Sequence, residues 1–208
     1  MNKLIKYILL SLALILIGYN SLYIKKLSDV NKSMNSNFDA AAFAKKIWTD
    51  KLPSRLDSAI DINNLKQLIE TNPIEAFNQY TNALDIGNNR YALVKGEGII
   101  DAVNEDDVAF TVKAKRPFNA FLATEFVYGN TLRDATGLFN LKDFPNTTDL
   151  NNLSKELNNI VRTEVVPLFK SKLKIGVHIE FIGAIELNKE HIHFDGLEII
   201  PIKVKIVP

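Results

Sequence analysis

The order of the regular segments predicts an α+β protein, mostly β, in which an antiparallel barrel holds one inserted helix. Apolar residues alternate with polar ones in about three segments before a long amphipathic helix, and in two or three segments after it. Glycines inside the long strand patterns suit the bends of a small barrel. This order is that of the OB fold, and an open antiparallel α+β sheet is the alternative.

The first 28 residues are predicted to be a signal sequence or membrane anchor. Residues 7–24 are uncharged and mostly apolar, with lysines on both sides. The run is at the lower limit for crossing a hydrocarbon core about 30 Å thick. Bulky Tyr19 and Tyr23 occupy the region where a cleavage site needs small residues, so an uncleaved anchor is favoured over a removed signal peptide or a buried helix. Residues 29–37 are a polar linker, and the domain after it is expected outside the inner membrane.

Composition excludes several classes of function. The chain of 208 residues has no cysteine, which rules out disulfides, thiolate nucleophiles and zinc–thiolate sites. The formal net charge is +1, and residues 1–32 hold five lysines and one aspartate, which leaves −3 for the rest. A weakly acidic domain is not expected to bind nucleic acid, because that needs a basic surface. No cofactor is predicted.

Residues 38–85 are predicted to be a helical N-terminal region. An apolar stripe predicts a first helix that Pro53 ends. Asp61 is the predicted N-cap of a second helix. Asn72 would cap a third helix, with Glu75 in the position of a capping-box acid.

Residues 88–208 are predicted to form the barrel domain. Glycines within residues 96–98 would bend or bulge the first strand, and an acidic turn at residues 104–107 leads into the second. Residues 121–128 are a further candidate strand. The 3.6-residue apolar period of residues 149–169 predicts the inserted helix.

The histidines suggest a weak metal-site hypothesis. His191 and His193 would share a face of a strand that returns from a two-residue turn at residues 188–189. In that register Glu186 faces His191, which gives two imidazoles and a carboxylate, while His178 lies farther along the hairpin. Histidines on a surface or an edge strand are the simpler interpretation.

Other chemical motifs are weak. The acidic residues 105–107 lack the ligand spacing and glycine of a calcium loop, so a solvated turn is favoured over a cation site. There is no nucleophile elbow, phosphate-binding loop, dinucleotide fingerprint or zinc-protease motif. The sequence therefore offers no catalytic signature.

The irregular segment 129–146 is the best candidate for a binding site, because long loops between regular elements often carry function. Arg133, Asp134, Asp143 and Asn146 could form a polar cluster for a hydroxylated or anionic ligand. The Arg–Asp pair could equally be a structural salt bridge that fixes the loop over one end of the barrel.

Several segments resemble a bacterial family of predicted periplasmic lipoproteins of unknown function. They are FDAAAFAKKIW (38–48), ALVKGEGII (92–100), GNTLRDATGLFNLKDFPN (129–146), IEFIGAIEL (179–187) and IIPIKVKIV (199–207). The resemblance implies an OB-like fold. Members are often encoded beside ribose-type sugar ABC transporters, which implies a transporter component or a small solute as partner. The family places a lipidated cysteine where this chain has Tyr19, so a membrane-spanning anchor would replace the lipid.

Together these observations favour a membrane-anchored periplasmic module, non-enzymatic, that acts as an accessory or binding protein in sugar transport. The alternative is a hydrolase or lyase acting on envelope carbohydrate with Asp134 and Asp143 as its carboxylate pair. That alternative requires the two carboxyl groups to lie within roughly 10 Å of each other across a cleft. A purely structural spacer is the third possibility.

Overall fold

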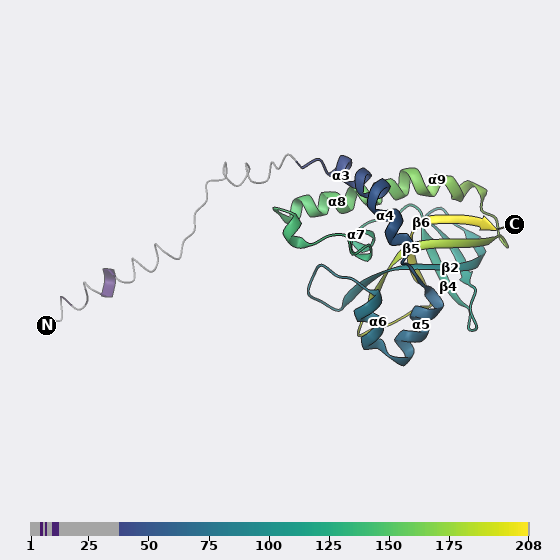
Figure 1. The fold of residues 1–208 in the computed structure, drawn as a ribbon, viewed down its shortest axis with the longest axis horizontal. Coiled ribbons are helices and arrows are strands. Elements are labelled where there is room, and N and C mark those ends of the chain that lie inside the picture. Colours follow the sequence, from purple (N-terminus) through teal and green to yellow (C-terminus); the bar gives the residue numbers. More distant parts are fainter. Residues whose placement is uncertain (1–4, 6, 8–9, 13–37, 208) are drawn as a thin grey trace. The chain divides into compact units, whose positions relative to one another are not determined.

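The computed structural model describes residues 5, 7, 10–12 and 38–207 (Figure 1). The predicted linker 29–37 and most of the predicted anchor lie outside these residues. Within the described part of the chain, no helix is both long and apolar enough to cross a membrane. Phe38–Pro208 form one compact unit, which includes both the helical region and the strands.

The first helix does not end at Pro53, contrary to the sequence prediction. It runs through α3 (Ala40–Lys46), the π-helical turn η1 (Ile47–Lys51) and α4 (Leu52–Leu56). In η1 the Leu52 N–H donates to the Ile47 carbonyl, five residues back. A wider π turn before Pro53 lets the helix accommodate a residue that lacks an N–H donor.

In the inserted helix, too, a π-helical turn precedes a proline. This helix consists of α8 (Thr147–Ile160), the π turn η3 (Val161–Val165), α9 (Val166–Phe169) and a last 3₁₀ turn, η4 (Lys170–Lys172). Pro167 follows η3 as Pro53 follows η1. The helix thus continues past a proline because a widened turn precedes it.

The two predicted caps of the helical region are confirmed. Asp61, at the end of β1 (Ile60–Asp61), accepts from the N–H groups of Asn63 and Asn64 and starts α5 (Ile62–Thr71). Asn72 accepts from the Glu75 N–H and starts α6 (Pro73–Tyr80). The Glu75 carboxylate accepts from the Asn72 side chain at 2.8 Å, because the Asn72 N–H already donates to Leu68.

The sheet has an OB-type strand order. It contains β2 (Asn89–Val103), β3 (Asp107–Val112), β4 (Phe118–Ala123), β5 (His178–Asn188) and β6 (Leu197–Val207), with β1 added parallel to β2. The pairings run β2–β3–β4–β6–β5, and β5 pairs with β2 again. The predicted α+β class is confirmed, but the sheet is not wholly antiparallel, because β4 and β6 are parallel.

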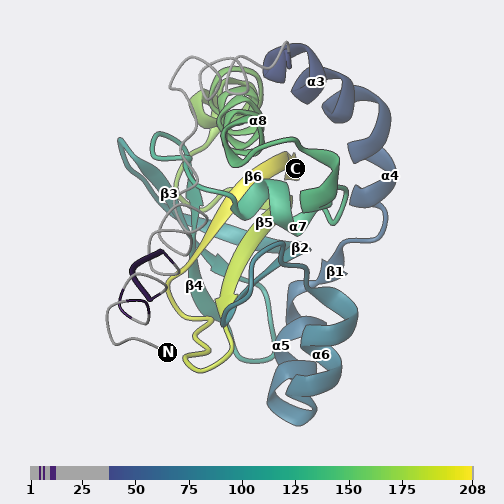
Figure 2. The same ribbon diagram turned by 90° about the vertical axis from the view of Figure 1, so that its left-hand side faces the viewer.

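Helices pack on more than one side of the sheet (Figures 1 and 2). The short helix α7 (Thr131–Ala135) contacts β2 and β5 and also contacts α8. Helix α3 packs on α8, and α6 contacts β2. The region between α7 and α8 is therefore held by elements that are far apart in the sequence.

The glycines at residues 96–98 do not bend the strand; they leave space for core side chains to pack against it. Strand β2 is continuous through them, and its register shift falls later, between Ile100 and Ala102. A Cβ on Gly98 would lie 2.5 Å from the Phe110 ring, which packs edge-to-face on Phe181 at 5.2 Å. The missing side chains let two core rings lie directly against the strand.

The predicted C-terminal hairpin is wrong. Strand β5 ends at Asn188, a loop follows, and β6 begins at Leu197, so that Ala184 pairs with Ile200. The Asn188 side chain accepts from the backbone N–H groups of Glu190 and His191, and this local turn replaces the strand predicted there.

The histidines consequently do not form the predicted strand pair. His191 and His193 are exposed in the loop between β5 and β6. The Nε2 of His178 lies 3.2 Å from the Glu97 carboxylate, which also pairs with Lys113. In the part of the chain that the structure describes, no group of three His, Asp or Glu side chains could hold a metal ion.

Candidate functional site

The segment predicted to be irregular contains regular structure. Residues 131–135 form α7, and Leu141–Asp143 form the 3₁₀ turn η2. A helix this short has too few residues to show a period in the sequence. The side chain of Asn82 donates to the Ala135 carbonyl at 3.2 Å and fixes the end of α7.

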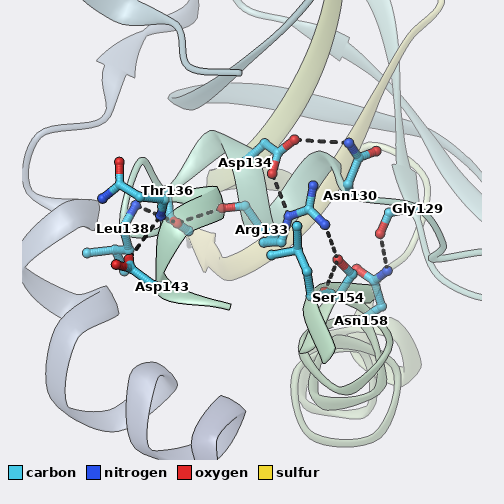
Figure 3. Close-up of polar contacts among 11 residues, drawn as sticks. Gly129, Asn130, Arg133, Asp134, Thr136, Leu138, Asp143, Ser154 and Asn158 are labelled. Atoms are coloured by element: carbon cyan, nitrogen blue, oxygen red, sulfur yellow. Dashed lines mark hydrogen bonds and ion pairs between the residues drawn. The ribbon is translucent and has the colours of Figure 1, made fainter. Parts of the chain in front are cut away.

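A buried ion pair lies at the centre of this region (Figure 3). The Arg133 Nε is 2.6 Å from the Asp134 Oδ1, and the two side chains are only 3% and 0% exposed. The Asn130 side chain donates to the second Asp134 oxygen at 2.9 Å, and the Arg133 Nη1 donates to the Ser154 hydroxyl at 3.0 Å. The pair joins α7 to α8.

Arg133 separates two cavities. The larger, of about 690 Å³, lies between residues 127–130 and one side of α8, and we call it the α8 cleft. The smaller, of about 370 Å³, is lined by Arg133, Asp134 and residues 81–84, among others. Side chains that line the α8 cleft include Tyr128, Arg133, Asn151, Ser154, Asn158 and Arg162. The α8 cleft falls in the range of small-molecule sites, roughly 300–1,000 Å³.

One buried side chain of the α8 cleft has unused hydrogen-bonding capacity. Asn158 is 3% exposed, and its Nδ2 donates to the Gly129 carbonyl at 2.8 Å, but its buried Oδ1 has no partner in the described chain. The Arg133 guanidinium is already paired, through its Nε with Asp134 and through its Nη1 with Ser154. Buried polar groups are nearly always paired, so a water molecule or a ligand group is expected to donate to the Asn158 Oδ1.

An aromatic rim lies beside the opening of the α8 cleft. Phe126 and Tyr128 are 57% and 65% exposed, with ring centroids 6.3 Å apart. The Arg162 guanidinium lies over the Tyr128 ring at 5.4 Å and donates to the Val127 carbonyl. Large aromatic side chains that remain exposed beside a polar cavity are typical of a binding surface.

The four residues proposed from the sequence do not all meet. Arg133 and Asp134 lie together in α7 and both line the smaller cavity, and of the two only Arg133 also lines the α8 cleft. Asp143 instead accepts from the Asn140 backbone N–H at 3.1 Å, and Asn146 caps α8 by accepting from the Asp149 N–H at 2.8 Å. Asp143 lines a different cavity from Asp134.

The sequence prediction did not include the α8 side of the cleft. Ser154 and Asn158 are four residues apart and buried, although they flank the apolar stripe of the helix. Polar residues on the buried face of an amphipathic helix are unusual, and this spacing was the signal that could have identified them.

The pKa of Tyr91 is sensitive to the charged groups around α7. Burial, and then the negative charge of Glu186, raise the pKa of the Tyr91 hydroxyl above its usual value, while the Asn130 side chain acts in the opposite direction. Tyr91 and Glu186 are cross-strand partners, and Glu186 also accepts from the Thr131 hydroxyl of α7 at 3.4 Å.

We therefore expect Glu186→Gln to lower the Tyr91 pKa relative to the wild type, because it removes a neighbouring negative charge. The pKa would be measured by NMR titration of ring-labelled tyrosine, with Tyr91→Phe to assign the signal. Glu180→Gln, on the same strand, is the control and should leave the Tyr91 pKa unchanged. An unchanged pKa in Glu186→Gln would show that burial and the other nearby carboxylates, Asp134 and Asp85, set the shift without Glu186.

A family model for proteins described as "Predicted periplasmic lipoprotein (DUF2291)" matches residues 12–205. The chain belongs to this family. The match spans α7, α8 and all the strands except the last two residues of β6, so the residues that line the α8 cleft fall within the matched range. The family description is consistent with a location in the cell envelope.

A solved structure shares the architecture. The chain is 27% identical to an OB-fold protein from Thermotoga maritima MSB8, with a TM-score of 0.72, and the match covers 83% of this chain and 100% of that one. No curated protein matches this member of the lipoprotein family. The comparisons thus give the family and an OB-fold structural neighbour, and the family description is consistent with the cell envelope.

Proposed function

We propose that this protein is a non-enzymatic accessory module of the cell envelope that binds a small polar solute in the α8 cleft. The observation that carries the proposal is the combination of a buried guanidinium and an unpaired buried amide oxygen in one cavity. A cavity with a few convergent polar groups is the usual form of a small-molecule site. A role in sugar transport is part of the proposal and rests on the expectation, from the sequence resemblance alone, that such proteins work beside sugar transporters.

Attachment at the membrane is part of the same proposal. The apolar residues 7–24 would hold the domain at the periplasmic surface of the inner membrane, since the chain has no cysteine that could carry a lipid. A transporter component is the proposed protein partner. Cross-linking of the full chain in native membranes should recover a transporter subunit, and recovery of no transporter subunit would contradict this part of the proposal.

The contacts of the two candidate carboxylates do not favour hydrolysis. Asp134 is held by Arg133 and Asn130, and Asp143 is held by the backbone of η2. They line separate cavities, so neither cavity has both an acid and a second carboxylate from this pair. A glycoside hydrolase needs both groups on opposite sides of one scissile bond.

The binding proposal is tested with the full chain in detergent micelles. Neutral sugars, sugar acids and amino acids would be screened by thermal shift, and the best ligand measured by isothermal titration calorimetry. Asn151→Ala is expected to weaken binding by about five- to tenfold, because it removes one hydrogen-bonding group of the cleft.

Asn152→Ala is the matched control, because Asn152 is the exposed neighbour that does not line the cleft. Its affinity should equal that of the wild type. The proposal fails if no solute stabilises the protein, or if the two alanine variants bind equally well.

A further inference from the structure

We infer that the solute of the α8 cleft is a hydroxyl-rich monocarboxylate, the chemical class of a sugar acid. This inference rests on the proposed function and adds the charge and the functional groups of the ligand. It follows from the charges of the cleft, its unpaired acceptor and its aromatic rim.

The ionisable groups of the cleft leave one positive charge in excess. Arg133, Lys155 and Arg162 line it, and Asp85 is the acid among its described lining residues. The charge of Arg133 is balanced by Asp134. Lys155 is exposed and forms no ion pair with the residues that the structure describes.

This local excess contrasts with the domain around it. Residues 33–208 carry a formal net charge of −3, so a positive cleft is a distinct feature of the surface. One excess positive charge matches a carboxylate, which carries a single negative charge. A phosphate monoester carries about −1.5 to −2 at neutral pH and would be only partly neutralised. A charged acceptor also forms the stronger hydrogen bonds with ammonium and guanidinium groups.

The remaining groups favour hydroxyls on the same ligand. The buried Asn158 Oδ1 is an unpaired acceptor, so a ligand group that pairs with it has to be a donor such as a hydroxyl, which a carboxylate cannot be. The amide of Asn151 and the hydroxyl of Thr147 add further exposed partners along α8. Tyr128 stays 65% exposed although Arg162 lies over its ring, so ring surface remains for contact with the C–H groups of a sugar-like carbon chain.

The test compares four probes by calorimetry on the full chain in detergent micelles: gluconate, glucose, acetate and glucose 6-phosphate. Gluconate is expected to bind about tenfold or more tightly than glucose, the usual gain from a charge-assisted hydrogen bond. Acetate and glucose 6-phosphate should bind more weakly than gluconate. Raising the salt concentration should weaken gluconate binding and leave glucose binding unchanged.

Lys155→Met should bring the affinity for gluconate to within about twofold of that for glucose, since the stem is kept and the charge removed. Lys174→Met, which changes an exposed lysine away from the cleft, should keep the preference. Glucose binding as tightly as gluconate, or glucose 6-phosphate binding best, would overturn this inference and leave the proposed function standing. No binding of any probe, together with a negative wider screen, would overturn both.

Discussion

Asp134→Ala is expected to lower the free energy of unfolding by about 3–5 kcal/mol, because it leaves the Arg133 guanidinium buried without its counter-ion. The Arg133 side chain is only 3% exposed, so the charge left behind is poorly solvated. The variant also removes the acceptor of the Asn130 side chain. Urea unfolding followed by circular dichroism would measure the change.

Two further variants make this prediction specific. Glu180→Ala breaks an ion pair with Lys205 whose side chains are 47% and 62% exposed, and it should change the unfolding free energy by no more than about 1 kcal/mol. Arg133→Met combined with Asp134→Leu removes both charges and should recover most of the stability. If Asp134→Ala is as mild as Glu180→Ala, the pair does not hold α7 against α8.

The sequence was most informative where structure is decided locally. Asp61 and Asn72 were predicted as helix caps because a short polar side chain before an apolar period satisfies the free N–H groups of the first turn. The strand–helix–strand order was visible because long elements show their periods. Pro53 was misinterpreted because the π turn before it is a matter of backbone geometry that has no residue signature.

The sequence predicted the residues that α7 contributes to the candidate site but not those that α8 contributes. Arg133 and Asp134 are adjacent in the sequence, and their pairing was one of the two interpretations that the sequence left open. Ser154 and Asn158 join them only because α7 folds over β2 and β5 and packs on α8. Such a contact depends on tertiary structure, and the pattern of one helix cannot show which distant side chain it meets.

The second large effect is expected at Gly183, in the strand that supports α7. A Cβ at this position would lie 2.4 Å from the Ile199 Cγ2 and 2.7 Å from the Ile200 carbonyl oxygen. The oxygen belongs to the backbone of β6, which pairs with β5 on both sides of this point. We therefore expect Gly183→Ala to lower the unfolding free energy by about 3 kcal/mol, at the upper end for overpacking, because a backbone atom cannot move aside as a side chain can.

Gly87→Ala is the matched control, since a Cβ there meets nothing within 4 Å, and its unfolding free energy should stay close to that of the wild type. Gly183→Ala with Ile199→Ala removes the side-chain clash and keeps the carbonyl, so it should not restore stability. Full recovery in this double variant would show that Ile199 alone creates the constraint. Hydrogen exchange along β5 and β6 would locate the damage, and faster exchange that extends to α7 would show that this close strand contact also holds the wall of the α8 cleft.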